Sequence, residues 1–354
     1  MRASGSCAGT CGGSGRVVVR RVGSGCRLCK ACFLTSFEND VLATIRRYDM
    51  FQKGERVAVA VSGGKDSTVL ASVLCALNSR ENLGLDLVLL SVDEGITGYR
   101  DDSLDAVRRS VEARGAGGPP LTIVSYKDLY GWAMDDVVRA AGSRNNCTFC
   151  GVFRRQAFDR GAALVKADVV ATGHNADDVA ETVLMNLLRG DIARLVRCAS
   201  PRSRGCGAGA PLPRAKPFLH IYEKEIVLYA HHARLDYHST ECVYSPGAYR
   251  GFAREFLKDL EAARPSSVTD IISSAAAWQG SEPDASTAPA RAQVACPRCG
   301  FAASGDGLCQ ACSLLAGLNA GTPRLALRSG GGQAGRDARA NAAAALAPEI
   351  PRSF

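Results

Sequence analysis

The segment Val57–Ser67, which reads VAVAVSGGKDS, constrains the fold of this chain more than any other segment. Its first five residues are small and apolar, and three of them are valines, so they predict a short strand buried on both faces. The residues SGG then break the strand, and a helix is expected from Thr68. A glycine turn that enters a helix offers backbone N–H groups and the positive end of the helix dipole to an anion. Lys65 and two serines add a cation and hydroxyls, so the segment predicts a phosphate-binding loop.

The spacing of this loop differs from the two commoner nucleotide motifs. The P-loop requires four residues between its first glycine and Gly-Lys-Ser/Thr, and the dinucleotide fingerprint is Gly-x-Gly-x-x-Gly. An ordinary tight turn between a strand and a helix is the remaining alternative. The sequence Lys-Asp-Ser directly after the glycines favours the phosphate-binding interpretation.

An alternation of short apolar segments and helical patterns surrounds this loop. Strands are expected at 57–61, 85–92, 121–126 and 167–172. Helices are expected from Thr68 onward, after Asp178 as far as Leu188, and at 37–49, 99–114, 127–141, 222–235, 248–263 and 266–278. Such alternation predicts an α/β fold with a parallel sheet and helices on both faces. Ligands of these sheets bind at the carboxyl ends of the strands. The polar strand ends 62–67, 93–95 and 173–178 should therefore converge on one crevice.

Fifteen cysteines occur in this 354-residue chain, mostly as Cys-x-x-Cys pairs and without a secretory signal, which indicates a reducing compartment. Near the C-terminus two such pairs are separated by nine residues, a strong zinc signal: Cys296, Cys299, Cys309 and Cys312. Near the N-terminus Cys29 and Cys32 form a clean pair, whereas Cys7 and Cys11 are one residue wider and Cys26 is a spare candidate. A first zinc ribbon is predicted there, with a disordered leader as the alternative.

A third cysteine group interrupts the α/β region. Cys147 and Cys150 form another Cys-x-x-Cys pair, and Cys242 stands alone much further along the chain. Spacing alone does not distinguish zinc, an iron–sulfur cluster and a catalytic disulfide. A buried structural pair is the fourth alternative, because cysteine packs as a small hydrophobic residue.

Charge and composition narrow the class of partner. The net charge of +8 and the pI near 8.8 favour an acidic partner such as nucleic acid. No apolar run approaches the roughly 20 residues that span a bilayer. The first 37 residues contain arginines and no acid, as mitochondrial transit peptides do, but they lack an amphipathic pattern and contain five cysteines, which favours a mature domain. The predicted division is a ribbon at 1–36, an α/β domain at 37–279, a linker at 280–295, a second ribbon at 296–320 and a disordered tail at 321–354.

Together these motifs resemble a known enzyme family. The ordered set comprises SGGKDS at 62–67, VDEG at 92–95, CTFCG at 147–151, TGHNADD at 172–178, RGD at 189–191 and the flanking ribbons. The chain resembles the catalytic subunits of the cytosolic tRNA 2-thiolation complex, which have an ATP-pyrophosphatase fold. The resemblance implies a cytoplasmic enzyme that binds tRNA, adenylates O2 of the wobble uridine with ATP and Mg²⁺, and replaces AMP with sulfur to give 2-thiouridine. It further implies the tRNAs for Lys, Glu and Gln, a related non-catalytic subunit, and a thiocarboxylated ubiquitin-related modifier as sulfur donor.

The same resemblance gives roles to individual residues. It implies that the loop binds the departing pyrophosphate through Ser62, Gly63, Gly64, Lys65, Asp66 and Ser67. Asp66 would lie near the Mg²⁺, and Lys65 and Asp66 would be catalytic. Asp93 and Asp177 are expected at the base and ribose side of the nucleotide, which Gly173 also contacts. Arg189 and Lys216 are candidates for the α-phosphate or a tRNA phosphate, with solvated surface residues as the alternative. His174 is expected to be positional. Cys147, Cys150 and Cys242 would hold a [4Fe–4S] cluster with one open iron, or one of the pair would carry a persulfide. Cys198 and Cys206 match no motif.

Other activities share parts of this set. Lysidine synthesis uses the same Ser-Gly-Gly loop but has no use for the three cysteines, and 2-thiocytidine formation is another ATP-dependent base modification of this type. A non-catalytic tRNA-binding scaffold is expected to lose the loop, whereas this chain retains Lys65, Asp66 and Ser67.

Overall fold

The structure is a computed structural model that describes residues 6–142, 146–203, 212–240, 242–244, 249–281, 293–304 and 307–322. Most of the predicted linker, almost all of the predicted tail and Cys206 lie outside these residues.

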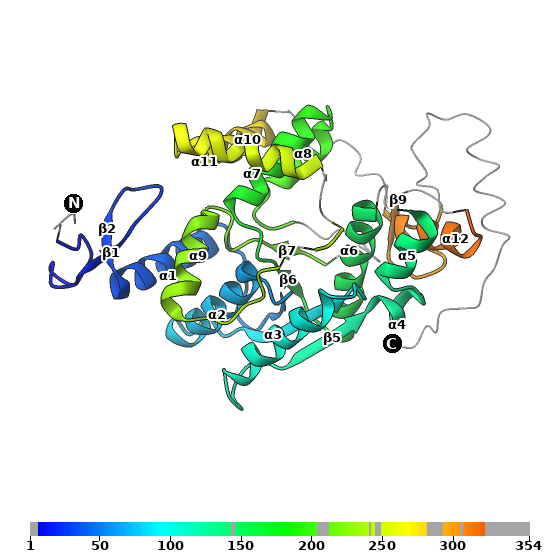
Figure 1. Cartoon of the computed structure of the whole chain (residues 1–354), viewed down its shortest axis with the longest axis horizontal. Helices are drawn as coiled ribbons and strands as arrows, with labels where there is room; N and C mark the ends of the chain where they lie inside the picture. Colours follow the sequence, from blue (N-terminus) through cyan, green and yellow to red (C-terminus); the bar gives the residue numbers. More distant parts are fainter. Residues whose placement is uncertain are drawn as a thin grey trace.

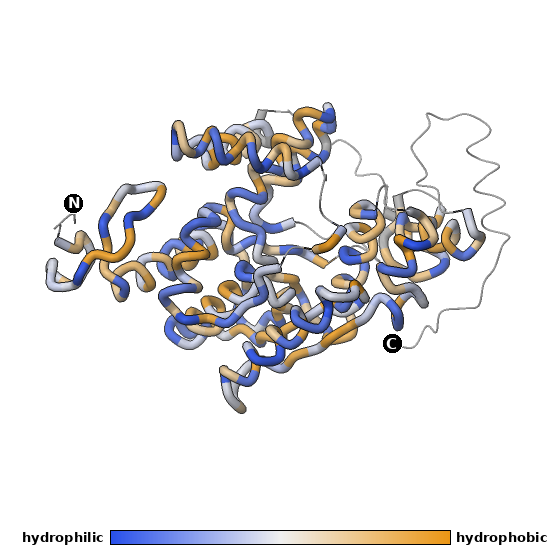
Figure 2. Tube along the Cα trace, viewed as in Figure 1, coloured by the Kyte–Doolittle hydropathy of each residue, from blue (hydrophilic) through white to orange (hydrophobic). Residues whose placement is uncertain are grey.

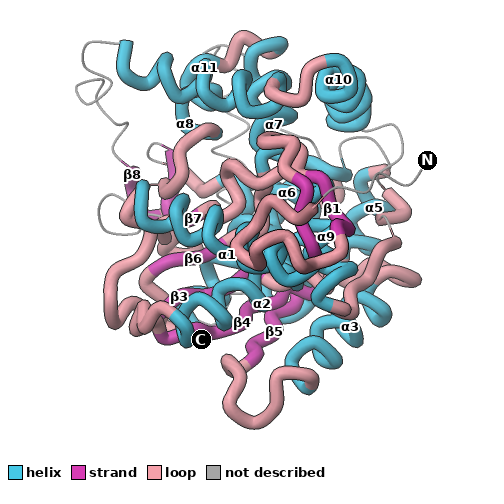
Figure 3. The backbone as a smooth tube through the Cα atoms, turned by 90° about the vertical axis from the view of Figure 1, so that its left-hand side faces the viewer, coloured by secondary structure: helices cyan, strands magenta, loops and turns pink. Residues whose placement is uncertain are grey.

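A parallel sheet of five strands forms the centre of the molecule. Its order is β5-β4-β3-β6-β7, and Figure 3 shows the strands side by side in this order. The strands are β3 Arg56–Ala60, β4 Asp86–Asp93, β5 Leu121–Ser125, β6 Val169–Ala171 and β7 Arg214–Ala215. Every neighbouring pair is parallel. The predicted parallel α/β sheet is therefore confirmed, and β7 is an additional short strand at its edge.

The strand before the phosphate loop is buried on both faces, as its composition predicts. Val57 and Val59 belong to one hydrophobic core, and Ala58 and Ala60 belong to a second core on the opposite face. This division follows from the two-residue period of side chains along a strand. Figure 2 shows that the strands of the central sheet consist mostly of hydrophobic residues.

Helices cover both faces of the sheet. In chain order they are α1 Lys30–Arg47, α2 Lys65–Arg80, α3 Arg100–Glu112, α4 Tyr126–Tyr130, α5 Met134–Ala141, α6 Asn146–Leu164, α7 Ala176–Leu188, α8 Ile192–Cys198, α9 Glu223–Ala233, α10 Tyr249–Ala263, α11 Ser267–Ser281 and α12 Gln310–Asn319. Helices α1, α2 and α9 contribute to the first core, and α5, α6 and α12 contribute to the second. None of the described helices is long and apolar enough to cross a membrane.

Several helices differ from those expected: α8 and α12 were not expected, and α1 begins at Lys30 instead of residue 37. The single helix expected at 127–141 is two helices, α4 and α5, because Gly131 ends α4 in the left-handed conformation with φ +75°. Helix α6, with 19 residues, was not predicted at all, although it carries Cys147 and Cys150.

A separate group of helices stands above the carboxyl side of β6. Helices α7, α8 and α11 share a third buried core with α10, and they lie together at the top of Figure 1. The exposed face of α10 carries the large side chains Tyr249, Phe252 and Phe256.

The two cysteine-rich segments lie at opposite ends of the long axis of the molecule (Figure 1). Each contains a two-stranded antiparallel hairpin, β1 Val17–Arg20 with β2 Arg27–Cys29, and β8 Gln293–Ala295 with β9 Ala302–Ser304. Helix α1 crosses the predicted boundary at 36/37, so the first hairpin continues directly into the central domain. The second hairpin and α12 pack on α6 and α5.

Candidate active site and metal centres

The phosphate loop is braced by its own serines and by α3. The Ser67 hydroxyl donates to the Gly64 carbonyl (2.9 Å) and accepts from the Ser62 amide (3.1 Å). Gly63 has φ +74°, and a Cβ there would lie 2.4 Å from the carbonyl oxygen of Ser103, so only glycine fits. Ser67 is buried, so its hydroxyl shapes the loop at the start of α2, where the helix offers its amides to an anion.

Lys65 lies between two carboxylates at this loop. Its Nζ is 3.1 Å from Asp66 Oδ2 and 2.9 Å from Glu223 Oε1. Glu223 begins α9, and its second oxygen is 3.0 Å from Lys258 Nζ on α10. Sequence reasoning missed Glu223 and Lys258, because nothing near them in the chain signals a phosphate site.

These ion pairs fix the charge states at the loop. Burial alone would lower the pKa of Lys65, but the charges of Asp66 and Glu223 raise it, so the ammonium is kept. Burial alone would raise the pKa of Glu223, but hydrogen bonds and charges from Lys65 and Lys258 lower it to about 2. Burial raises the pKa of Asp66. Lys65 therefore stays positively charged, whereas Asp66 beside it takes up a proton more readily than an exposed aspartate does.

The loop after β6 approaches the phosphate loop closely. A Cβ on Gly173 would lie 3.1 Å from the carbonyl carbon of Asp66, so glycine favours this close approach of the two backbones. Asn175 caps α7 and donates from Nδ2 to Asp66 Oδ1 (3.1 Å), which ties the two predicted strand ends together. His174 is exposed, and its Nδ1 lies 2.9 Å from the Thr172 hydroxyl.

Asp93 and Asp177, the two predicted aspartates, form hydrogen bonds and ion pairs with other residues of the protein. Asp93, at the end of β4, accepts from the Gly95 amide (2.8 Å) and pairs with Arg100 (2.8 Å). Asp177 accepts from the Glu223 amide (2.8 Å) through one oxygen and pairs with Lys258 (2.7 Å) through the other. The structure therefore gives Asp177 a bracing role between α7, α9 and α10.

The two predicted basic residues lie in different places. Arg189 is the C-cap of α7, so a helix of 13 residues, about 20 Å, separates it from the strand end of β6. Its guanidinium lies over the ring of Tyr249 (5.3 Å), and the structure does not bring it to the phosphate loop. Lys216 directly follows β7, where Nζ donates to the carbonyls of Cys198 (2.6 Å) and Ser200 (3.1 Å). Burial lowers the pKa of Lys216 to about 8.

Cys147 and Cys150 lie in the first turns of α6. Tyr126 donates from its hydroxyl to the Cys150 carbonyl (2.9 Å), and Arg154 donates to Cys150 Sγ (3.5 Å). Arg154 also pairs with Glu94 (2.8 Å), which immediately follows β4. Burial raises the pKa of Cys150, and the nearby guanidinium counteracts part of this effect. Arg154 was not predicted, because its position one turn after Cys150 becomes visible only once α6 is known.

The segment that contains Cys242 lies against this pair. Cys147 Sγ donates to the Tyr244 carbonyl (3.8 Å), and the charge of Cys242 contributes to the raised pKa of Cys150. Among the described residues, these three sulfurs are not within the 4.8 Å that gathers each group of four cysteines. Cysteine thiolates are the usual ligands of iron–sulfur clusters, so the chemistry of this donor set fits a [4Fe–4S] cluster.

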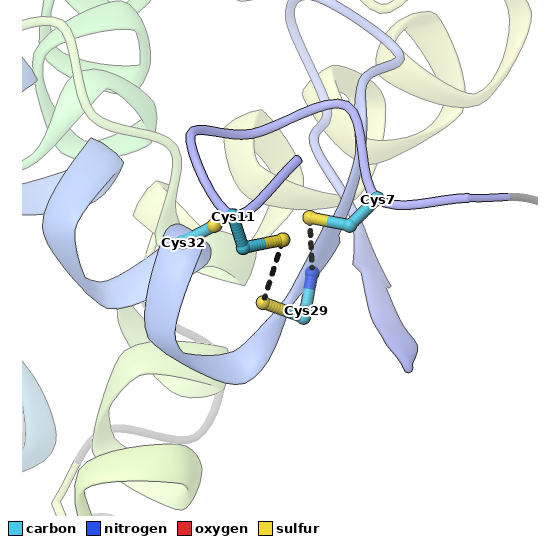
Figure 4. Close-up of side chains that lie close together, drawn as sticks. All are labelled: Cys7, Cys11, Cys29 and Cys32. Atoms are coloured by element: carbon cyan, nitrogen blue, oxygen red, sulfur yellow. Dashed lines mark hydrogen bonds between the residues drawn. The ribbon is translucent and has the colours of Figure 1, made fainter. Parts of the chain in front are cut away.

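The first four-cysteine cluster consists of Cys7, Cys11, Cys29 and Cys32, whose sulfurs all lie within 4.8 Å of one another. Figure 4 shows the Cys7 sulfur at the Cys29 amide (3.2 Å) and the Cys11 sulfur facing Cys29. A hydrogen bond from the Gly15 backbone, followed by the Cys7 thiol, lowers the pKa of Cys11 to about 6. The wide Cys7–Cys11 spacing is therefore compatible with a common site.

Two glycines make room for this cluster. A Cβ on Gly9 would lie 2.6 Å from Cys32 Sγ, and a Cβ on Gly15 would lie 2.6 Å from Cys29 Sγ. Cys26 is exposed and is not part of the group. Such a cradle of thiolates without competing side chains fits a tetrahedral metal ion.

The second four-cysteine cluster consists of Cys296, Cys299, Cys309 and Cys312, as the spacing predicts. Hydrogen bonds from the thiols of Cys299 and Cys312 lower the pKa of Cys309 to about 2. The Cys309 amide donates to Cys296 Sγ (3.3 Å). Closely packed sulfurs with backbone donors fit a structural metal site.

Comparisons with known proteins agree with this architecture. The family model of the PP-loop domain matches residues 34–260. Cytoplasmic tRNA 2-thiolation protein 1 of Malassezia globosa is 52% identical over 362 residues, which cover 96% of this chain and 95% of the relative. The proteins of the same name from Oryza sativa subsp. japonica and Arabidopsis thaliana are 58% and 56% identical over 88% of this chain, and the matches cover 83% and 85% of these relatives.

A solved structure is also similar over most of its length. The U34-tRNA thiolase NcsA from Methanococcus maripaludis with its [4Fe–4S] cluster is 30% identical and superposes with a TM-score of 0.73. The match covers 90% of this chain and 97% of that protein. The chain therefore belongs to the cytoplasmic tRNA 2-thiolation protein 1 family of PP-loop proteins.

Proposed function

We propose that this protein is a tRNA sulfurtransferase that adenylates the wobble uridine with ATP and then converts it to 2-thiouridine. The relatives of the same family are named for cytoplasmic tRNA 2-thiolation, and the similar solved structure is a U34-tRNA thiolase. The predicted α/β PP-loop fold and the cytoplasmic family agree with this assignment.

Tyr99 and His238, which lie beside the phosphate loop, support the proposal. The Gly63 carbonyl accepts from the His238 amide (2.8 Å), and the His238 ring packs edge-on against Tyr99 (5.3 Å). Burial, followed by the charge of Glu94, raises the pKa of Tyr99, and the charge of Arg154 counteracts part of this effect. We infer that the uridine binds between the phosphate loop and the cysteine pair.

In the first step, O2 of the uridine attacks the α-phosphorus of ATP and pyrophosphate leaves. The attacking oxygen is neutral, so the charge that must be stabilised develops on the phosphates. The permanent Lys65 cation and the N-terminus of α2 are placed to bind the departing pyrophosphate. Asp66 fits a Mg²⁺ ligand, because its carboxylate is held beside the loop by Asn175.

In the second step, sulfur attacks C2 of the activated uridine and AMP leaves. When bound by Cys147, Cys150 and Cys242, a [4Fe–4S] cluster would supply an open iron for sulfide. In the alternative, the outer sulfur of a persulfide on one of the pair attacks C2, and the other thiolate then cleaves the S–S bond and leaves a disulfide. This route requires a donor of sulfane sulfur in place of a thiocarboxylate and a reductant that restores the thiols, and it uses the same cysteines. Arg154 is placed to stabilise negative sulfur at Cys150, and Tyr126 holds the backbone of that turn.

The partners and the metals complete the proposal. We infer that zinc occupies both four-cysteine clusters, that tRNAs for Lys, Glu and Gln are substrates, and that a thiocarboxylated ubiquitin-related modifier delivers sulfur. A related non-catalytic subunit is the expected heterodimer partner. The net charge of +8 supports tRNA as the acidic ligand.

The function is tested by incubating the purified chain and its partner subunit with ATP and tRNA. We expect AMP and pyrophosphate to form only when tRNA is present, and 2-thiouridine to form only when a sulfur donor is added. AMP formation without tRNA dependence would contradict the proposal.

Arg154→Gln is expected to slow the formation of 2-thiouridine by about 10- to 100-fold, because a hydrogen bond from a charged group to the sulfur is lost. Formation of AMP should change little, since Arg154 contacts Cys150 and Glu94 rather than the phosphate loop. Both rates are measured on the same tRNA. Arg154→Lys keeps the charge and should retain more activity, and equal losses in both variants and both steps would argue against this role.

Cys11→Ser is expected to reduce the zinc content from two ions per chain to one, because Cys11 is one of four sulfurs in the first cluster. Elemental analysis of the anaerobically purified chain measures this change. Cys26→Ser is the matched control, since Cys26 lies in the same hairpin but outside the cluster. Loss of zinc in the control instead would show that the ligand set is wrong.

A further inference from the structure

One side chain of the central domain contacts sulfurs of the second four-cysteine cluster. Gln156 is buried on α6, and its Nε2 donates to Cys309 Sγ (3.2 Å) and to Cys299 Sγ (3.4 Å). The amide therefore bridges the two halves of the cluster, since Cys299 belongs to the first Cys-x-x-Cys pair and Cys309 to the second. A carboxamide nitrogen has two hydrogens, so it can serve both sulfurs at once.

The first four-cysteine cluster is supported differently. Its described hydrogen-bond donors come from its own hairpin, such as the amides of Gly9 (3.4 Å) and Cys29 (3.2 Å) to Cys7 Sγ. In the part of the chain that the structure describes, no side chain of the sheet domain is seen to donate to that first cluster. The two clusters thus differ in one feature, a glutamine from a helix of the catalytic domain.

That helix is also the one that carries the sulfur-transfer cysteines. Gln156 follows Cys150 by six residues, a rise of about 9 Å along α6. Between them Phe153 stacks on Tyr130 (4.8 Å), and the Tyr130 hydroxyl donates to the Phe153 carbonyl (3.0 Å). The middle of α6 is therefore held from one side by α4.

The second four-cysteine cluster packs against α6 within the second hydrophobic core. Cys296, Cys309 and Cys312 are buried in the same hydrophobic core as Phe149 and Phe153. Figure 1 shows the C-terminal hairpin and α12 directly beside α5 and α6. The cluster consequently forms part of the wall against which the cysteine-bearing helix packs.

We propose that Gln156 is a positioning residue through which metal at the second four-cysteine cluster holds α6 and thereby sets the placement of Cys147 and Cys150. Hydrogen-bond donors to metal-bound thiolates stabilise their negative charge, and loss of such partners typically costs 10- to 100-fold in metal affinity. The inference rests on the proposed metal occupancy of the clusters. It extends the proposed function by coupling a structural metal to the sulfur-transfer site.

The first test measures zinc release from the full chain under a chelator in excess. Gln156→Met keeps length and packing but removes both donors, so we expect one of the two zinc ions to leave about 10- to 100-fold faster. The other ion, in the first cluster, serves as the internal control and should be unaffected. Gln156→Glu adds a carboxylate beside the sulfurs and should accelerate the same phase further.

The outcomes separate positioning from packing. A residue that merely filled space would give wild-type release in Gln156→Met, and this result would overturn the proposal. Equal acceleration of both zinc ions would indicate general destabilisation and would overturn it too. A wild-type chain without zinc at the second cluster would have the same consequence.

The second test measures the reactivity of Cys150 in zinc-loaded, iron-free protein. Alkylation followed by mass spectrometry should show Cys150 reacting several-fold faster in Gln156→Met, because a less firmly held turn opens more often. Cys75 on α2 is the control thiol, and its rate should stay unchanged. Faster zinc release with unchanged Cys150 reactivity would overturn the positioning role. Neither test uses ATP, tRNA or thiolation, so both stand if the proposed enzymatic function fails.

Discussion

Replacement of Lys65 by Ala is expected to reduce tRNA-dependent AMP formation by about 10²- to 10³-fold, the usual cost of removing one preorganised group from a developing charge. Lys65 is the cation of the phosphate loop, and two carboxylates hold its Nζ within 3.1 Å. Its loss leaves the Asp66 carboxylate beside the loop without its cation, whereas Glu223 keeps Lys258. The release of AMP and pyrophosphate is measured with saturating tRNA.

Lys53→Ala is the matched control, because Lys53 is an exposed lysine before β3, at the opposite end of that strand from the loop. Thermal unfolding of both variants shows whether the fold is intact. Adenylation by Lys65→Ala at the wild-type rate would refute the assignment of the loop.

Cys150→Ser is expected to abolish 2-thiouridine formation while tRNA-dependent AMP formation continues. Serine keeps nearly the same volume, but its hydroxyl neither carries sulfur nor ligates iron as a thiolate does. The contacts of Cys150 are to Tyr126 and Arg154, not to the phosphate loop. Nucleoside analysis of the tRNA by mass spectrometry measures thiolation, and nucleotide analysis of the same reaction measures AMP.

Cys198→Ser is the control for this variant. Cys198 ends α8, donates to the Leu195 carbonyl (3.0 Å) and lies outside both four-cysteine clusters and the cysteine triad. It should leave thiolation unchanged. If Cys150→Ser loses both activities, the division of labour between the loop and the thiolates is wrong.

The sheet and the phosphate loop could be predicted because their signals are local. The two-residue period of β3 shows directly in its sequence, and both faces are buried as the valines and alanines indicate. The second four-cysteine cluster was predicted correctly for the same reason, since the spacing within each pair fixes a tetrahedral site.

Helix α6 was missed because its buried face is not uniformly apolar and includes Asn146 and Gln156. This face packs on the sheet and on α5 and α12, whereas the opposite face, with Arg154 and Arg155, is exposed. Gly151 and Gly161 weaken the helical signal further. A Cβ at Gly161 would lie 2.8 Å from a methyl group of Leu90, so a larger residue there would displace that side chain.

The sequence also did not predict the partners of Asp177 and Lys65, because these contacts form between segments far apart in the chain. A position near a strand end does not determine where its side chain points, so Asp177 turns toward α9 and α10 instead of the loop. Glu223 and Lys258 come from helices late in the chain, and only the folded arrangement brings them to Lys65. No short segment of sequence contains that information.

If the first four-cysteine cluster holds metal as proposed, the continuity of α1 would link metal supply to the amount of protein in the cell. Cys29 is the N-cap of α1 and Cys32 lies in its first turn, while Phe33 and Phe37 of the same helix are fully buried in the first core. Empty thiolates at this end would loosen a helix on which the central domain itself depends. A chain without metal would then be cleared by proteases as a whole, because small losses of stability change cellular abundance several-fold.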